Sequence, residues 1–258
     1  MIRELARKYG TWQRIEILSD VGIIGIPFDR TPEELRPFAE DLLRTLRLRS
    51  VWGRYRGVDE VSRVGKYVHL AGERVSEVIY KEHGFKFVLD FTKVFFSQKL
   101  MFEHDRLSRL VREGEVVINM FAGFGPLSIM SCKRGNPRVV YSIDISPFAY
   151  YYNLVNVDLN RAYCVIPMWR DAFEVINELP EADRIFAPLP ELADKAYEVA
   201  IRRLKPGGTL HLFAQVEVQK GEDPVKVAMS KYRGAFFARV VRSYKPGVYH
   251  VIVDIKAD

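Results

Sequence analysis

A short segment with two glycines has the residue types and spacing for chemistry. The apolar run at residues 115–120 leads into Phe121-Ala122-Gly123-Phe124-Gly125-Pro126. Glycine lets the backbone turn tightly and approach a ligand at the start of a helix. The pattern G-x-G is weak by itself, because it also fits dinucleotide binding and ordinary surface turns.

Two acidic residues further along the chain strengthen this pattern. Asp144 lies 19 residues after Gly125, at the end of the next apolar run, where a carboxylate can accept hydrogen bonds from ribose hydroxyls. Asp171-Ala172 follow a third apolar run, where a carboxylate can accept from an adenine amino group. Each acid alone could be a helix cap. Their joint order at strand ends predicts a nucleoside-bearing cofactor.

Two features favour S-adenosylmethionine over NAD as that cofactor. Leu127-Ser128 stand where G-x-G-x-x-G has its third glycine. The chain also ends in two strand-like runs, at residues 237–244 and 249–255, around Lys245-Pro246-Gly247. Such a terminal antiparallel hairpin is typical of class I S-adenosylmethionine-dependent enzymes.

The elements that must position these residues alternate regularly. Strand-like runs at residues 115–120, 139–143, 163–166, 184–187 and 209–213 are separated by helical segments, one of them at 191–204 before Lys205-Pro206-Gly207-Gly208. This alternation is typical of a parallel sheet covered by helices. We therefore expect an α/β class I methyltransferase fold, Rossmann-like, with a seven-stranded sheet and an antiparallel C-terminal hairpin, over residues 87–258.

The first third of the chain predicts a small α+β domain, residues 1–86. Short apolar runs occupy residues 15–18 and 21–27, and further strand-like runs lie at 67–72 and 85–90. A helix is announced by Thr31, Pro32 and Glu34, which form a capping box around a proline suited to the first helical position.

A cluster of arginines in this domain is a candidate RNA contact. Trp52 and Tyr55 are interleaved with five arginines and no acid: Arg44, Arg47, Arg49, Arg54 and Arg56. Guanidinium groups match phosphate oxygens, and flat aromatic rings stack on exposed bases. A solvated helix face with two core aromatics explains this segment equally well.

Composition limits the remaining possibilities. The 258 residues are 48% hydrophobic and 28% charged, with a net charge of +6, which is ordinary for a globular protein. Neither a membrane-spanning run nor a signal core is present, so we expect a cytoplasmic protein, and a monomer. Cys132 and Cys164 are too few for a disulfide framework or a zinc cluster. We expect no metal, and both cysteines as buried small side chains.

Several blocks resemble the family of tRNA guanine-37 N1-methyltransferases, which also contains the wybutosine-synthesising aminocarboxypropyltransferases. The resemblance runs from about residue 13 to the C-terminus and is most specific between Phe95 and Pro147. The matching blocks are Phe95-Phe96-Ser97-Gln98-Lys99-Leu100 with Glu103 and Arg106, then Met120–Ile129 around the glycines, Ile143-Asp144-Ile145-Ser146-Pro147, and Asp183–Pro190.

The resemblance implies roles for individual residues. Glu103 corresponds to the family's general base, and Arg63 to an arginine that stabilises the purine oxygen. Pro188-Leu189-Pro190 would bind the base of a tRNA anticodon loop. The residues implied to bind S-adenosylmethionine are Phe96, Ser97, Phe121, Ala122, Gly123, Gly125, Asp144, Ile145, Asp171 and Ala172. The chemistry is coherent, because attack by guanine N1 needs an acceptor for its proton and its O6 gains negative charge.

Departures from the family pattern leave the reaction open. The family has an acid where this chain has Asn119, an arginine where it has His104, and an asparagine that is missing from the segment beginning at Ala187. The motifs around the cofactor favour N1 methylation of guanosine 37. The ending from Tyr244 to Asp254 resembles the wybutosine enzymes and favours aminocarboxypropyl transfer to the tricyclic precursor. A non-catalytic tRNA-binding protein of the same fold is a third possibility.

Overall fold

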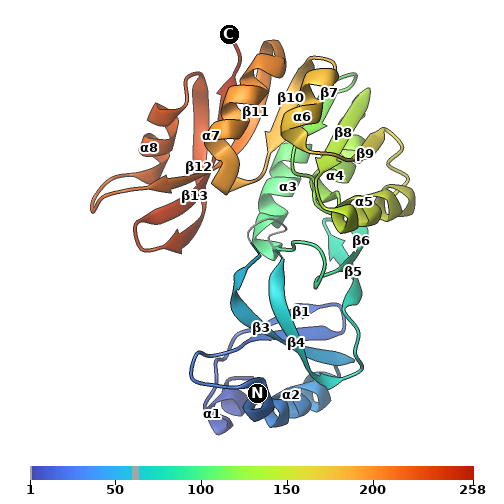
Figure 1. Cartoon of the computed structure of the whole chain (residues 1–258), viewed down its shortest axis with the longest axis vertical. Helices are drawn as coiled ribbons and strands as arrows, with labels where there is room; N and C mark the ends of the chain where they lie inside the picture. The colour runs from blue at the N-terminus through green and yellow to red at the C-terminus, as the bar shows by residue number, and fades with distance from the viewer. Residues whose placement is uncertain (1, 60–63) are drawn as a thin grey trace. The chain divides into compact units, whose positions relative to one another are not determined.

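The computed structural model describes residues 2–59 and 64–258, which form two compact units, Met1–Phe96 and Ser97–Asp258 (Figure 1). The predicted catalytic residue Arg63 lies outside the described residues, so its role stays a prediction. Within the described part of the chain, no helix is long and apolar enough to cross a membrane.

Unit 1 is built on a four-stranded sheet in the order β1-β2-β3-β4. Its strands are β1 (Ile15–Leu18), β2 (Val21–Gly25), β3 (Ser50–Val58) and β4 (Gly65–Gly72). Only the β2–β3 pair within this sheet is parallel, because the connection between them is the helix α2 (Pro32–Leu46). A short helix, α1 (Ile2–Lys8), precedes the sheet.

Helix α2 begins as the sequence predicts. The backbone N–H of Thr31 donates to Glu34 Oε2 at 2.7 Å, and the Thr31 hydroxyl accepts from the backbone N–H of Glu34 at 3.4 Å. Leu35, Phe38 and Leu42 then occupy one side of the helix and are buried in the core of unit 1. The hairpin of β5 (Glu77–Glu82) and β6 (Phe85–Asp90) completes this unit as a separate two-stranded sheet.

Unit 2 has the predicted class I methyltransferase fold. Its seven-stranded sheet has the order β12-β13-β11-β10-β7-β8-β9, and β13 is antiparallel to both β11 and β12. The strands are β7 (Val116–Asn119), β8 (Val139–Asp144), β9 (Val165–Trp169), β10 (Ala182–Ala187), β11 (Leu204–Glu217), β12 (Ala235–Lys245) and β13 (Val248–Lys256). The order reverses beside β7, and open α/β sheets bind ligands at such a point.

Helices cover both faces of this sheet. One apolar core holds side chains of α6 (Ala172–Val175), α7 (Ala193–Ala200) and α8 (Pro224–Lys231). The remaining helices are α3 (Met101–Ser108), α4 (Pro126–Gly135) and α5 (Pro147–Leu159). Of these, α4 and α5 pack against β8 and β9. Short 3-10 turns lie at Gln98–Leu100, Ile176–Glu178, Pro190–Leu192 and Ile201–Arg203.

Some predicted element boundaries differ from the structure. The helical segment expected at 191–204 is split into a 3-10 turn, α7 and another 3-10 turn, and β11 already begins at Leu204. Pro206-Gly207-Gly208 therefore lie inside β11, where the pairing with β10 shifts register between Ala182 and Arg184. The strand expected at 163–166 is β9, which begins at Val165 and continues to Trp169.

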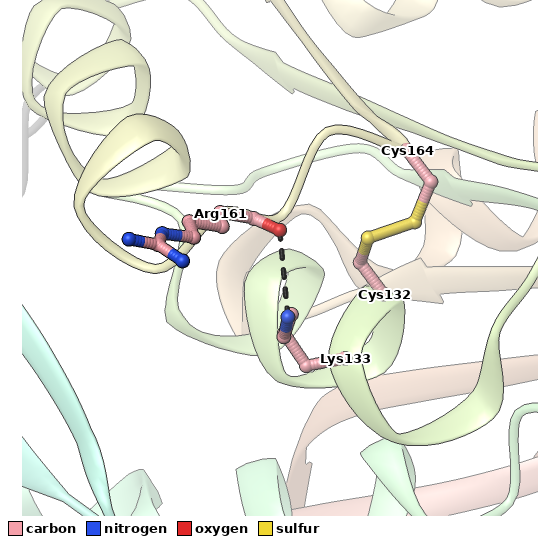
Figure 2. The surroundings of a disulfide bond; sticks show 4 residues. All are labelled: Cys132, Lys133, Arg161 and Cys164. Carbon is pink, nitrogen blue, oxygen red and sulfur yellow. Dashed lines mark hydrogen bonds between the residues drawn. A yellow bond between two sulfur atoms is a disulfide. The ribbon is translucent and has the colours of Figure 1, made fainter.

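The cysteines form a disulfide, so the expectation of two separate buried thiols is wrong. Figure 2 shows Cys132 of α4 joined to Cys164, just before β9. Their Cα atoms are 5.9 Å apart, within the usual span of a disulfide. The two residues are 32 positions apart in sequence, and only the packing of α4 against β9 brings them together.

Candidate cofactor and catalytic site

The glycine loop after β7 is held by both neighbouring strands. The backbone N–H of Met120 donates to the carbonyl of Phe186 in β10 at 2.9 Å, and that of Ala122 donates to Ile143 in β8 at 2.8 Å. Gly123 has φ +57° and Gly125 has φ +92°, in the left-handed region that favours glycine. A Cβ on Gly125 would collide with the side-chain oxygen of Asn153, whereas one on Gly123 would point into open space. The loop is therefore fixed and leaves room beside Gly123.

Asp144 closes this loop from the end of β8. Its Oδ2 accepts from the backbone N–H of Gly123 at 2.7 Å, and its Oδ1 accepts from the N–H of Ser146 at 2.9 Å. Burial raises the pKa of Asp144 above its ordinary value, although these backbone donors oppose the shift. The half-buried carboxylate thus lies beside the glycine loop, as predicted from a spacing of 19 residues.

The surroundings of Asp144 fit the adenosyl part of S-adenosylmethionine. Ile145 is 54% exposed, so it offers an apolar surface for a flat base. Asp171 follows β9 and caps α6 by accepting from the N–H of Phe173 at 2.8 Å, while Ala172 is buried. Phe121 packs against Phe173, with ring centroids 5.8 Å apart. These residues come from the ends of adjacent strands β7, β8 and β9, which fits a cofactor laid across that edge.

The predicted base-binding segment lies at the end of the strand on the other side of β7. Pro188, Leu189 and Pro190 follow β10 and are half-buried. Because β7 and β10 are parallel neighbours, this segment and the glycine loop start at the same edge of the sheet. A group carried by the cofactor would therefore face a base held there.

Phe96 and Ser97 occupy the junction of the two units. Phe96 is the last residue of unit 1, where its ring packs edge-on against Tyr80 of β5 with centroids 4.7 Å apart. Ser97 is the first residue of unit 2 and precedes the 3-10 turn before α3. Their predicted contact with the cofactor stays a prediction.

Glu103 is buried and fully engaged. Its side chain is 1% exposed, its Oε2 accepts from Arg106 Nε at 2.8 Å, and its Oε1 accepts from Arg239 Nη1 at 2.6 Å. Arg239 lies on β12, is 35% exposed, and stacks over the ring of Phe102 at 4.1 Å. A carboxylate with a guanidinium on each oxygen is fixed in direction. Each carboxylate oxygen has a second lone pair, which can accept a proton beside the bound guanidinium.

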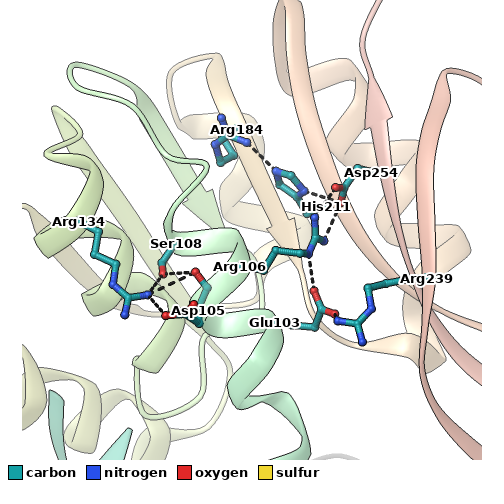
Figure 3. Close-up of polar contacts among 9 residues, drawn as sticks. All are labelled: Glu103, Asp105, Arg106, Ser108, Arg134, Arg184, His211, Arg239 and Asp254. Carbon is teal, nitrogen blue, oxygen red and sulfur yellow. Dashed lines mark hydrogen bonds and ion pairs between the residues drawn. The ribbon is translucent and has the colours of Figure 1, made fainter. Parts of the chain in front are cut away.

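From Glu103 a chain of charged side chains crosses one face of the sheet (Figure 3). Arg106 donates to both oxygens of Asp254 in β13, at 2.7 and 3.2 Å. Asp254 pairs with His211 Nδ1 at 2.7 Å, and His211 Nε2 lies 2.7 Å from Arg184 Nη1. The last contact of this series joins Arg184 Nη2 to Glu115 Oε1 at 2.8 Å. We call Glu103, Arg106, Asp254, His211, Arg184 and Glu115 the buried charge chain.

The protonation states along this chain follow from its contacts. Burial alone would raise the pKa of Asp254, but hydrogen bonds from His211 and Arg106 outweigh it and lower the pKa to about 2. Burial lowers the pKa of His211, against the pull of Asp254. His211 is therefore neutral, with Nδ1–H donating to Asp254 and Nε2 accepting from Arg184. Buried charges need such partners to be stable.

Helix α3, which carries Glu103, is also fixed to α4. Arg134 of α4 donates to the Ser108 hydroxyl at 2.7 Å and pairs with Asp105 at 2.7 Å. Figure 3 shows this contact beside the buried charge chain. The helix that carries Glu103 is thus tied to the helix that begins at the glycine loop.

A cavity of about 590 Å³ lies along the same charge chain. Its walls include Arg106, Arg184, His211 and Asp254, and none of the predicted cofactor residues. It is therefore distinct from the glycine loop.

The predicted arginine strip is dispersed in unit 1. Arg44 pairs with Asp41 at 2.5 Å, and Arg49 pairs with Asp20 at 3.0 Å, so acids outside the segment neutralise part of it. Arg47 ends α2 in the left-handed conformation. Trp52 is buried, with its Nε1 donating to the carbonyl of Val75 at 2.9 Å, so it cannot stack on a base.

Two arginines of the strip lie beside aromatic rings. Arg54 lies over Tyr67 at 5.8 Å, and Arg56 lies over the exposed ring of Phe28 at 3.8 Å. Tyr55 between them is 39% exposed. The possible RNA contact is therefore narrower than the sequence suggests and is centred on Tyr55.

Four residues near the candidate catalytic region were not predicted from the sequence: Arg239, Asp254, His211 and Arg184. Asp254 carried a signal, because it is an acid within a strongly apolar terminal strand. Arg239 carried none, since β12 contains other basic residues and its register against β13 decides which one meets Glu103.

The fold and the glycine–aspartate site define a class I S-adenosylmethionine-dependent enzyme. Residues 78–232 match the TRM5/TYW2 methyltransferase domain, and the chain belongs to that family. It is 56% identical to the tRNA 4-demethylwyosine(37)-methyltransferase Taw21 of Saccharolobus solfataricus, over 100% of this chain and 99% of that protein. It is 31% identical to the tRNA (guanine(37)-N(1))-methyltransferase Trm5b of Pyrococcus abyssi, over 93% and 74%.

Further relatives agree with this assignment. The tRNA(Phe) (4-demethylwyosine(37)-C(7)) aminocarboxypropyltransferase of Methanocaldococcus jannaschii is 33% identical over 74% of this chain and 79% of that protein. The structure of aTrm5 with tRNALeu superposes with a TM-score of 0.87 at 27% identity, covering 100% of this chain and 78% of that one. The M. jannaschii TYW2 complex with AdoMet gives 0.70 at 27%, covering 94% and 98%. The chain is an S-adenosylmethionine-dependent transferase.

Proposed function

We propose that this chain is a cytoplasmic enzyme that methylates the base at position 37 of tRNA, with 4-demethylwyosine as its substrate. The observation that carries the proposal is its 56% identity, over the whole chain, to a protein named for that reaction. The glycine loop and the 188–190 segment, side by side at one sheet edge, support it. Bound S-adenosylmethionine supplies a methyl group on a positively charged sulfur.

The chain's own residues would bind and orient the reactants. Asp144 and the loop at Gly123 hold the cofactor, and Pro188-Leu189-Pro190 hold the base. Glu103 accepts the proton that leaves the base, while Arg106 and Arg239 hold its two oxygens in direction. Unit 1 contributes contacts to the tRNA through Arg54 and Arg56, and the unplaced Arg63 would stabilise the base oxygen.

Two other reactions are the main alternatives. Unmodified guanosine 37 as the methyl acceptor is favoured by the 31% identity to Trm5b. Aminocarboxypropyl transfer to the same precursor is favoured by the 33% identity to the enzyme named for it. We prefer methylation of 4-demethylwyosine because the identity to the relative named for that reaction is higher and covers the whole chain.

Mass spectrometry of tRNA nucleosides tests the proposal. The protein is incubated with S-adenosylmethionine and with two tRNAs, one bearing guanosine at position 37 and one bearing 4-demethylwyosine. A gain of one methyl group on the second tRNA supports the proposal. Methylation of the first alone, or a gain of the larger aminocarboxypropyl group, would replace it with the corresponding alternative. Heat-denatured protein is the control.

A further inference from the structure

Strand β12, the outermost strand of the large sheet, has two different sides. Ala238 and Val240 pack against the apolar core that contains α8, and their partners on β13, Val253 and Val251, belong to the same core. Side chains alternate between the two sides of a strand. The residues between them therefore lie on the other side of the sheet, where α3 makes its contacts with β12 and β13.

The side of β12 toward α3 carries arginines. Arg239 lies opposite Ile252 of β13, and a register shift in β12 then places Arg242, instead of Val241, opposite His250. Positions two apart on β13 share one side of that strand, so the bulge returns Arg242 to the side of Arg239. The irregular pairing thus keeps both arginines on one surface.

Both of these arginines lie over aromatic rings. The guanidinium of Arg239 is 4.1 Å from the ring centroid of Phe102, which is 59% exposed. That of Arg242 is 5.7 Å from the centroid of Tyr244, which is 52% exposed. Tyr244 is in turn stacked on His250, with centroids 5.0 Å apart and an interplanar angle of 15°. Arginine combines such stacking with in-plane hydrogen bonds to phosphate oxygens.

The charges of β12 are of one sign. Its 11 residues include Arg239, Arg242 and Lys245 and no acid. Lys245 lies opposite Val248, so it shares the side of Arg242, and the acid Glu217 is separated from it by the intervening strand β13. We call Phe102, Arg239, Arg242, Tyr244 and Lys245 the β12 face.

The β12 face leads toward the candidate catalytic site. Strands β11 and β12 are both antiparallel to β13, and β11 is parallel to β10, so β12 runs in the direction of β10. Its end with Tyr244 and Lys245 therefore lies at the sheet edge from which the 188–190 segment starts. Further back along the strand, Arg239 contacts Glu103 at 2.6 Å. A chain of nucleotides along this face would pass close to Glu103.

We propose that the β12 face binds unpaired nucleotides of the anticodon loop that flank the modified base, with phosphates at Arg242 and Lys245 and a base stacked on Tyr244. The inference rests on the proposed function, which makes tRNA the substrate. Cations match the phosphates, and exposed rings stack on bases of any sequence. Bases in a loop can be turned outward for such stacking, whereas those inside a duplex cannot.

A strand of another protein fits this edge less well. Three register shifts interrupt the pairing of β12 with β13, and the strand is basic. Bulges and charged side chains are the features by which edge strands avoid pairing with another chain. That purpose needs the charges alone and does not explain exposed rings beside them. RNA uses both.

Fluorescence anisotropy of a labelled anticodon stem-loop RNA, without cofactor, tests this inference. Arg242→Gln/Lys245→Gln should bind about tenfold more weakly at about 0.15 M salt. The slope of log K against log salt should become shallower by about 1.4, because two phosphate contacts are lost at about 0.7 each. Tyr244→Ala should weaken binding about fivefold or more without changing the slope, since the ring carries no charge, and Tyr244→Phe should restore it.

Arg202→Gln/Lys226→Gln is the matched control, because it removes the same two charges from exposed residues of unit 2. Arg202 lies in the 3-10 turn Ile201–Arg203 and Lys226 lies in α8, and both elements pack on the other side of the sheet. This variant should bind the stem-loop like the wild type. A fully paired RNA duplex of equal length should be bound equally by the wild type and all variants.

The outcomes separate this inference from the proposed function. Wild-type affinity and slope in Arg242→Gln/Lys245→Gln would overturn the β12 face, as would an equal loss in the control variant or on the duplex. Weaker binding by the variants, in a protein that methylates neither tRNA, would support the face and reject the function. Thermal unfolding and S-adenosylmethionine binding unchanged from wild type would show that the weaker binding does not come from misfolding.

Discussion

Arg239 and Glu103, 136 residues apart, form the closest ion pair of the candidate catalytic region, with Nη1 2.6 Å from Oε1. The two partners differ in freedom. Glu103 is 1% exposed and fixed by Arg106 on its other oxygen, whereas Arg239 is 35% exposed on β12. Arg239 is therefore the partner that can move, and we infer that it positions Glu103 without touching the reacting atoms.

Substitution of Arg239 tests this positioning. Arg239→Ala should lower kcat about tenfold and leave KM for S-adenosylmethionine unchanged, because the direction of Oε1 is lost while the cofactor residues are untouched. Arg239→Lys should recover part of the loss, since an ammonium can still pair with Oε1. A variant with normal kcat and a lower melting temperature would show that the pair serves stability alone.

Removal of the Glu103 carboxylate should separate binding from transfer. Glu103→Ala should slow transfer about 10²-fold or more and leave cofactor binding intact, because the acceptor for the departing proton is lost. Glu103→Gln keeps an acceptor for one of the two arginines and disturbs the packing less than alanine does. Single-turnover kinetics is the measurement, with the exposed Glu198→Gln as control. Wild-type rates in both Glu103 variants would remove the general-base assignment.

Asp144 should be essential for the cofactor. Asp144→Ala removes the acceptor for the Gly123 N–H and for ribose hydroxyls, so calorimetry should detect no S-adenosylmethionine binding. Asp223→Ala is a useful comparison, because Asp223 caps α8 through the N–H of Val225 at 2.9 Å. That variant should lose about 1 kcal/mol of stability and bind the cofactor normally. Cofactor binding by Asp144→Ala within a few-fold of wild type would contradict the assignment.

The disulfide should contribute substantially to stability. Cys132 and Cys164 close a loop with a sequence separation of 32 residues. Restricting the unfolded chain by a loop of this length is worth about 3–4 kcal/mol in the chain-entropy view. Urea unfolding with and without reductant should show that loss, and a Cys132→Ser/Cys164→Ser variant should be insensitive to reductant. Equal midpoints for the reduced and oxidised wild type would argue against the bond in solution.

His211 should make the stability of unit 2 depend on pH. Because burial lowers its pKa in the folded state, the unfolded chain binds the proton more readily, with a pKa near 6.5. The free energy of unfolding should be level above about pH 6.5 and fall below it by up to about 1.4 kcal/mol per pH unit. Protonation of Asp254 should lower the free energy of unfolding further as the pH falls from about 4 to its lowered pKa of about 2.

A histidine replacement isolates the first of these losses. His211→Asn keeps a donor toward Asp254 and cannot be protonated, so its unfolding free energy should be flat between about pH 6.5 and 5. Denaturant titrations at fixed pH values measure this, with the exposed His83→Asn as control. A wild-type slope in His211→Asn would assign the pH dependence to other groups.

Local patterns in the sequence determined the fold class and predicted the candidate cofactor site. Gly123, Gly125 and Asp144 follow adjacent parallel strands, and the C-terminal ends of such strands meet at one sheet edge, so their sequence spacing fixes their meeting in space. The capping box of Thr31 and Glu34 was predictable for the same kind of reason, since all its contacts lie within four residues.

Only the tertiary structure decided the contacts between distant elements. The Arg239–Glu103 pair depends on the register of β12, and the Cys132–Cys164 bond depends on how α4 packs against β9. The strip from Arg44 to Arg56 reads as one basic surface, yet Asp20 and Asp41 neutralise part of it and Trp52 is buried. Pairwise contacts across many residues are set by packing, and no local pattern encodes them.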